Sequence, residues 1–167
     1  EILTRLVGSE MCIRASGGGK SCAWELPTLS RHLNGRKTKM SIVMVPYCFL
    51  AAHHYQSCVK RFGLVSCNLD IKCLTGKDFE EGQLPNDLKN VDLLPSILFV
   101  SLEAMSLLFK NHSVYMKNLV ERELVHKVFV DECHTILTEV NFRDKYLCMR
   151  ELAVSYTHLT LPTSIQV

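Results

Sequence analysis

The stretch that decides the fold runs Val128-Phe129-Val130-Asp131-Glu132-Cys133-His134. Its first part is apolar and consists of β-branched and aromatic residues, which is typical of a strand buried in a parallel sheet. Two carboxylates follow directly, so they stand where the strand ends. In an open sheet of parallel strands, ligands bind in the crevice beside the carboxyl ends. The stretch therefore predicts an α/β fold whose ligand site includes Asp131 and Glu132.

Strand and helix patterns alternate along the rest of the chain. Apolar or alternating segments predict further strands over 41–45, 70–74 and 97–100. Helical spacing predicts helices over 20–34 and 49–62, between the later strands, and after Phe142. Residues 77–92 are acidic and contain Gly82 and Pro85, which predicts a loop with at most one helical turn. This alternation predicts a three-layer α/β domain, a mostly parallel sheet with helices on both faces.

The composition is that of an ordinary globular domain. The chain has 167 residues, of which 47% are hydrophobic and 22% charged, so it is neither disordered nor fibrous. No apolar run reaches the roughly 18 residues of a membrane helix, and the amino terminus lacks the pattern of a signal peptide. The net charge of +2 is too small for binding nucleic acid by bulk electrostatics alone. Eight cysteines without a C-x-x-C pair predict reduced, buried thiols in an intracellular protein and no zinc site.

A glycine-rich segment, Ser16-Gly17-Gly18-Gly19-Lys20-Ser21, opens the first predicted helix. Glycines allow backbone N–H groups to turn towards a phosphate, and the amino terminus of the helix adds partial positive charge. The Lys20 side chain would reach the β- and γ-phosphates of a nucleotide, and the Ser21 hydroxyl would bind Mg²⁺. Arg14 stands where the strict phosphate-loop pattern has its first glycine, so a flexible turn before a helix remains the alternative.

The acidic pair after the last predicted strand supplies the complementary half of such a site. Asp131 would hold Mg²⁺ directly or through water, and Glu132 would orient and activate the attacking water. An exposed acidic turn after a core strand is the alternative interpretation. The glycine-rich segment weighs against that alternative, because both features converge on the crevice at the carboxyl ends of the strands. Together they predict a single site for ATP and Mg²⁺.

These motifs, in this order, resemble the first RecA-like lobe of superfamily 2 helicases, and the RecQ-like branch fits best. The matching segments are Gly17-Gly18-Gly19-Lys20-Ser21 with Leu26-Pro27 (motif I), 43–47 with Leu50 (motif Ia), Val100-Ser101-Leu102-Glu103 (motif Ib) and Asp131-Glu132-Cys133-His134 (a D-E-x-H box). The resemblance implies a RecA-like P-loop domain whose central strand precedes Gly17. It also implies a DNA helicase that hydrolyses ATP with Mg²⁺, located inside the cell and in the nucleus of a eukaryote. Lys20, Asp131, Glu132 and His134 would be catalytic, with His134 coupling ATP to the other helicase motifs.

The resemblance also implies a nucleic-acid contact. In that family, the loops after motifs Ia and Ib contact the sugar–phosphate backbone of one strand. Pro46, Tyr47 and Ser101 are therefore candidate nucleic-acid contacts, and a purely structural role at the strand ends is the open alternative. The RecQ-like resemblance favours DNA over RNA. Two other functions stay open: another P-loop ATPase or translocase, and an inactive remnant that acts as a nucleic-acid-binding module.

Both ends of the chain resemble translated sequencing adapter. Residues 6–14 and 153–163 look like the translation of a transposase adapter used for sequencing libraries, and native sequence at both ends is the alternative. We therefore expect adapter-like extensions at 1–14 and 153–167 and a helicase fragment over 15–152. The family's adenine-binding segment, motif III and second RecA-like lobe would lie outside this fragment. Because the second lobe carries the arginine finger, we expect the fragment alone to be inactive.

Overall fold

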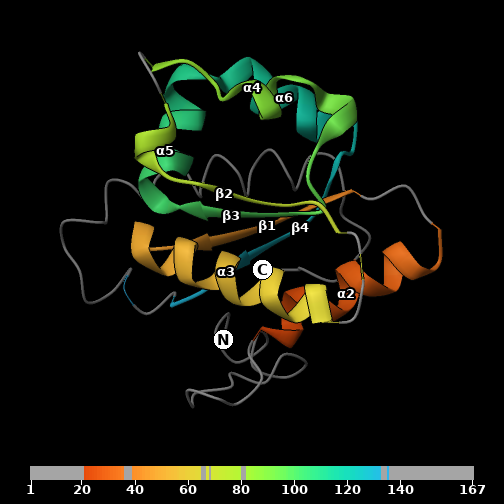
Figure 1. Cartoon of the computed structure of the whole chain (residues 1–167). Helices are drawn as coiled ribbons and strands as arrows, with labels where there is room; N and C mark the ends of the chain where they lie inside the picture. Colours follow the sequence, from red (N-terminus) through yellow and green to blue (C-terminus); the bar gives the residue numbers. More distant parts are fainter. Residues whose placement is uncertain are drawn as a thin grey trace, which may run out of the picture.

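A computed structural model describes residues 21–35, 39–64, 67, 69–79, 82–132 and 135 (Figure 1). The predicted helix after Phe142 and the predicted strand before Gly17 lie outside the described residues. The remaining predicted elements fall within the described part of the chain and can be compared with it directly.

The described strands form one parallel sheet. They are β1 (Met40–Val45), β2 (Ile71–Leu74), β3 (Ile97–Ser101) and β4 (Val125–Val130). Their order is β2-β3-β1-β4, so β1 and β3 are central among them. At mid-sheet Val43 pairs with Phe99 on one side and with Phe129 on the other. This sheet confirms the predicted fold class and the presence of each predicted strand of the described region. The stretch 128–130 of β4, predicted as buried, is only half-buried, because β4 pairs with β1 alone among the described strands.

Strand β4 begins at Val125, earlier than the apolar pattern from Val128 indicated. A polar pair, His126 and Lys127, interrupts the apolar pattern there. The pairing between β1 and β4 shifts register at this point: Met40 pairs with Val125 and the next residue of β1 pairs with Lys127. Strand β4 therefore contains one extra residue, which forms a bulge. Backbone pairing with β1 extends the strand through His126 and Lys127, where the hydrophobic pattern did not predict a strand.

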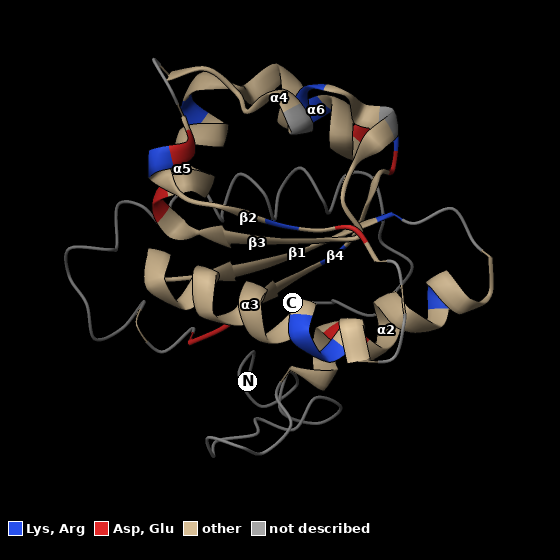
Figure 2. Ribbon diagram, in the orientation of Figure 1, with Lys and Arg blue, Asp and Glu red and all other residues tan. Residues whose placement is uncertain are grey.

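Helices cover both faces of the sheet (Figure 1). The helices of one face are α2 (Cys22–Leu33) and α3 (Cys48–Leu64), and those of the other are α4 (Asn86–Lys89), α5 (Leu102–Asn111) and α6 (Ser113–Glu121). In Figure 2 the charged residues lie mainly on the helices and near the ends of the strands. The arrangement confirms the predicted three layers, with the apolar strands covered from both sides.

The segment from residue 77 to 92 is more helical than predicted. Helix α4 lies between two 3₁₀ turns, Gly76–Asp78 and Val91–Leu93. Leu84 and Leu88 from this segment are buried in the core beside α5 and α6. Burial of these leucines holds successive short turns in place, although glycine, proline and acidic residues favour a loop locally.

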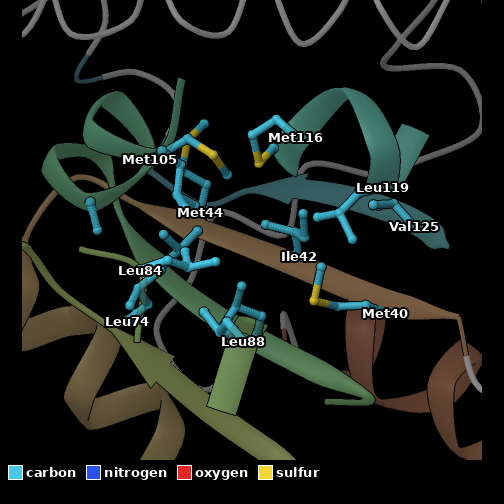
Figure 3. Close-up of a cluster of buried hydrophobic side chains, with 14 of the residues drawn as sticks. Met40, Ile42, Met44, Leu74, Leu84, Leu88, Met105, Met116, Leu119 and Val125 are labelled. Atoms are coloured by element: carbon cyan, nitrogen blue, oxygen red, sulfur yellow. The ribbon is translucent and has the colours of Figure 1, made fainter. Parts of the chain in front are cut away.

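Alternate residues of β1 enter two separate hydrophobic cores. Met40, Ile42 and Met44 lie in the core that α5 and α6 cover (Figure 3). Val43 and Val45 lie in the core that α2 and α3 cover. Successive side chains of a strand point to opposite faces, so a strand buried on both sides needs an unbroken apolar run. This explains why the strand segment that the sequence predicted shows no polar alternation.

Candidate functional site

The candidate site lies at the carboxyl ends of the parallel strands. Asp131 and Glu132 follow β4, Pro46 follows β1, and Ser101 is the last residue of β3. The backbone N–H of Asp131 donates to the carbonyl of Met44 at 2.9 Å, which continues the ladder between β4 and β1 past the end of β4. The sheet itself therefore fixes the position from which the Asp131 side chain projects.

The carboxylate of Asp131 is held by a donor at each oxygen. Nε2 of His54, from α3, lies 3.0 Å from Oδ2. The backbone N–H of Glu132 donates to Oδ1, also at 3.0 Å. The Asp131 side chain is only 11% exposed, so these hydrogen bonds offset part of the cost of burying its charge. An ionised carboxylate can only accept hydrogen bonds, which makes Nε2 of His54 the donor.

An aromatic cluster encloses the imidazole of His54. The ring of Phe99 stacks on it, with centroids 6.1 Å apart and planes at 19°. The indole of Trp24, from the first turns of α2, meets it edge-on at 5.6 Å. Trp24 also contacts Phe129 at 6.3 Å between ring centroids. Residues from α2, α3, β3 and β4 thus converge beside Asp131, a grouping that the sequence analysis did not find.

The turn after β4 has an unusual backbone. Glu132 has a φ of 52°, in the left-handed region that side-chain-bearing residues rarely adopt. Both the backbone N–H and the hydroxyl of Thr135 donate to the carbonyl of Glu132, at 3.0 and 2.9 Å. Glu123, at the turn before β4, has the same φ of 52°, so this backbone conformation is not peculiar to the candidate site, and the role of Glu132 stays a prediction.

The glycine-rich segment reaches the described region at Ser21 only. Ser16 to Lys20 lie outside the described residues, and so does His134 of the acidic motif. Ser21 stands immediately before α2, and its side chain makes no capping hydrogen bond to the helix. Trp24, one turn further along, contacts His54 and Phe129. The amino terminus of α2 therefore lies on the face of the sheet that α3 also covers, beside the histidine that contacts Asp131.

The three candidate nucleic-acid contacts differ in exposure. Pro46 is buried directly after β1. Tyr47 is half-buried, and its ring stacks on Phe49 at 5.5 Å with planes at 15°, leaving the Phe49 side chain 64% exposed. Ser101 is buried, and its hydroxyl accepts a hydrogen bond at 3.2 Å from the backbone N–H of Ala104. The helix cap gives Ser101 a structural role, and contact with nucleic acid stays a prediction for all three.

The loops after β2 and β3 pack against each other at the same edge. A Cβ built on Gly76 would lie 2.8 Å from Cδ of Glu103, in the first turn of α5. Any larger residue at position 76 would displace this carboxylate. Thr75, just before the glycine, donates from its backbone N–H to Asp78 and so closes the turn. Because Glu103 is exposed and only its outer side-chain atoms are met, a larger residue at position 76 could be accommodated by movement of this carboxylate.

An ion pair joins α2 to α3 below the site. Glu25 accepts hydrogen bonds from the Arg61 guanidinium, with Nε 3.1 and 3.2 Å from its two carboxylate oxygens. The Glu25 carboxylate raises the pKa of Arg61 above its usual value. Beside this pair, burial and then the Glu25 charge raise the pKa of Cys58 to about 12. The thiol is therefore protonated at neutral pH and serves as a small apolar group. The prediction of buried thiols was wrong for Cys22 and Cys48, which are exposed on the helices α2 and α3.

The described residues contain neither a cluster of metal ligands nor a membrane-spanning helix. No three His, Cys, Asp or Glu side chains there are grouped as ligands of a metal ion. No helix in the same region is both long and apolar enough to cross a membrane. A Mg²⁺ site of a nucleotide needs no such cluster, because one carboxylate and one hydroxyl suffice where phosphate oxygens supply the other ligands.

Comparison with known proteins identifies the family. Residues 2–165 match the family described as DEAD/DEAH box helicase. No curated protein matches the chain. The RecQ-like branch and the boundaries of the 15–152 fragment stay predictions. The match spans nearly the whole chain, and the parallel sheet with an acidic pair at its carboxyl edge agrees with it. The chain therefore belongs to the DEAD/DEAH box helicases, a family of ATP-hydrolysing enzymes that act on nucleic acids.

Proposed function

We propose that this chain is the ATP-binding lobe of a RecQ-like DNA helicase, which couples ATP hydrolysis to movement along DNA or to separation of its strands. The observation that carries the proposal is the Asp131-Glu132 pair at the carboxyl end of β4. There the Asp131 carboxylate is oriented by two hydrogen bonds, and the Glu132 backbone is held in a strained turn. The membership of the DEAD/DEAH box helicase family supports the same function.

Each polar residue of the site has a distinct role in this proposal. Lys20 would hold the phosphates of ATP, and Ser21 and Asp131 would hold Mg²⁺. Hydroxyl and carboxylate oxygens are hard ligands of the kind that Mg²⁺ prefers, so the residues present fit this ion. Bound Mg²⁺ would neutralise phosphate charge. Glu132 would orient the attacking water, and His134 would couple the site to the rest of the helicase.

DNA would bind along the same edge of the sheet. Pro46, Tyr47 and Ser101 mark the ends of β1 and β3, and these ends lie beside the Asp131 site because the strands are parallel. Half-buried Tyr47 and its exposed neighbour Phe49 present aromatic surface there. The preference for DNA over RNA, and a nuclear location in a eukaryote, rest on the RecQ-like resemblance. We propose that the chain alone binds ATP weakly and does not unwind DNA.

Titration with mant-labelled ATP in the presence of Mg²⁺ tests the nucleotide site. Lys20→Ala should abolish binding without unfolding the chain, because in this proposal its ammonium would supply the positive charge that holds the phosphates. Lys110→Ala, which removes an exposed lysine near the end of α5, is the matched control and should bind as the unsubstituted chain does. Retention of full affinity in Lys20→Ala, with a circular dichroism spectrum showing the native fold, would refute the phosphate role.

Binding of labelled single strands completes the same experiment. Single-stranded DNA should bind more tightly than RNA of the same length, and its affinity should fall as salt increases because phosphate contacts dominate. Equal affinities would reject the DNA preference while leaving the helicase function in place. Absence of binding to both would favour another type of P-loop ATPase.

A further inference from the structure

Helix α3 carries two adjacent histidines with different surroundings. His53 is exposed, whereas the side chain of His54 is 20% exposed and faces the sheet. Adjacent residues on a helix point about 100° apart, so only one of the pair can reach the strand ends. Neither residue belongs to the segments that resemble the helicase motifs.

His54 touches the candidate site through one short contact. Its Nε2 lies 3.0 Å from Oδ2 of Asp131, while the other carboxylate oxygen accepts from the backbone N–H of Glu132. Donors on both oxygens determine the plane of the carboxylate as well as its position. An ionised carboxylate accepts hydrogen bonds at both oxygens, so these two contacts orient the group.

The imidazole is itself fixed in place. Phe99 stacks on one face of the ring and is fully buried, and the Trp24 indole, 4% exposed, abuts it edge-on. Rotation of the ring away from Asp131 would require displacement of these core side chains. Packing of this kind is what gives a supporting residue control over the geometry of a ligand residue.

We propose that His54 is a positioning residue that holds the Asp131 carboxylate in the orientation that binds the Mg²⁺ of Mg·ATP. The inference rests on the proposed function, because it requires Asp131 to be a Mg²⁺ ligand. It gives a function to His54, a residue outside the motif segments, and attributes that function to the single hydrogen bond with Asp131. The α3 helix thereby becomes part of the nucleotide site, although it contributes no ligand of its own.

Two substitutions separate the hydrogen bond from the packing. His54→Phe keeps an aromatic ring between Trp24 and Phe99 but removes the donor. His54→Gln loses the ring but places an amide N–H near the position of Nε2. His53→Ala, on the exposed neighbour, is the matched control. In each variant the dissociation constant of mant-labelled ATP is measured with Mg²⁺ and again with EDTA, together with the thermal unfolding midpoint.

The expected result is a loss that depends on Mg²⁺. The gain in affinity that Mg²⁺ provides should fall by roughly tenfold or more in His54→Phe, while the affinity in EDTA stays unchanged. His54→Gln should recover most of the gain even if its unfolding midpoint is lower, and His53→Ala should keep all of it. A purely structural role predicts the opposite order, with the phenylalanine variant the better of the two.

The outcomes also separate this inference from the proposed function. If the unsubstituted chain binds ATP and gains affinity from Mg²⁺, an unchanged gain in His54→Phe overturns the inference alone. Equal losses in Mg²⁺ and in EDTA overturn it as well, because they assign His54 to general support of the site. If the unsubstituted chain gains nothing from Mg²⁺, the proposed function fails and the inference fails with it.

Discussion

At the scale of single residues, Cys58 links the protonation of a buried thiol to stability. Burial, and second the Glu25 carboxylate, raise its pKa from 9.0 to about 12. Between these values the unfolded chain releases the thiol proton and the folded chain retains it. The free energy of unfolding should therefore fall as the pH rises above 9, and the loss continues until the folded thiol titrates near 12.

Urea unfolding at pH values below and above 9 tests the prediction. Cys58→Ala should show a shallower fall in the free energy of unfolding between pH 8 and about 10 than the unsubstituted chain. Some slope should remain, because burial also raises the pKa of Cys73 to about 11 and that of Tyr115 to about 12. Cys22→Ala, at an exposed cysteine, should keep the original slope. Equal slopes in all variants would contradict the assignment to Cys58.

Single residues were predictable where their function depends on the local sequence. Asp131 and Glu132 could be identified because they directly follow an apolar strand, and the structure places them at the expected edge of the sheet. His54 could not be identified, because its contact with Asp131 spans 77 positions and depends on how α3 packs on the sheet. Nothing in the spacing of a histidine pair on a helix reveals which one turns inward towards an acidic residue.

At the scale of elements, Ser101 joins β3 to α5 and tests whether its role is structural. Its hydroxyl caps the amino terminus of the helix by accepting from the Ala104 N–H at 3.2 Å. Ser101→Ala should lower the free energy of unfolding by about 1 kcal/mol, since an orphan backbone donor loses its partner. Ser101→Thr should retain most of the stability because it keeps the hydroxyl.

The control for the Ser101 prediction lies in the neighbouring helix, α6. Ser113→Ala, at the exposed first position of α6, removes a hydroxyl that caps nothing there and should change stability little. Stability is measured by urea unfolding, and single-stranded DNA affinity by fluorescence anisotropy in the same variants. If Ser101→Ala weakens DNA binding but leaves stability unchanged, Ser101 contacts nucleic acid and the cap is unimportant.

Strands and helices could be predicted where the hydrophobic pattern of the sequence matches burial in the structure. The strands around Val43 and Phe99 are apolar except for one buried serine each, Ser41 and Ser101, because both of their faces are buried. The start of β4 could not be predicted, because His126 and Lys127 lie in the ladder through backbone pairing and a bulge. The turns within 77–92 form for a similar reason: Leu84 and Leu88 are buried against distant helices, which a local pattern cannot show.

At the scale of the whole molecule, the two helical layers have different roles. Trp24 and His54 approach Asp131 from α2 and α3, so the face they cover carries the support of the candidate site. On the other face, α5 and α6 bury a large apolar core together with β1 and β3 (Figure 3). The sequence predicted both layers but could not assign the site to one, because that depends on which helix faces the strand ends.

This division predicts that stability and nucleotide binding can be changed separately. Leu119 of α6 is 1% exposed and lies in the core away from α2 and α3. Leu119→Ala should lower the free energy of unfolding by about 2–5 kcal/mol, through lost burial and the cavity left behind. Val114→Ala, on the same helix but at a side chain that is 73% exposed, should cost far less.

Nucleotide affinity in the destabilised variant then decides whether the layers are independent. At temperatures below its thermal unfolding midpoint, Leu119→Ala should bind mant-labelled ATP with an affinity close to that of the unsubstituted chain. No described side chain of the site lies in the core that contains Leu119. A proportionate loss of affinity in the folded variant would show that the sheet transmits repacking from one face to the other. In that case β1 and β3, which belong to both cores, would be the connection, and substitutions at Met44 and Val43 should then weaken ATP binding to similar extents.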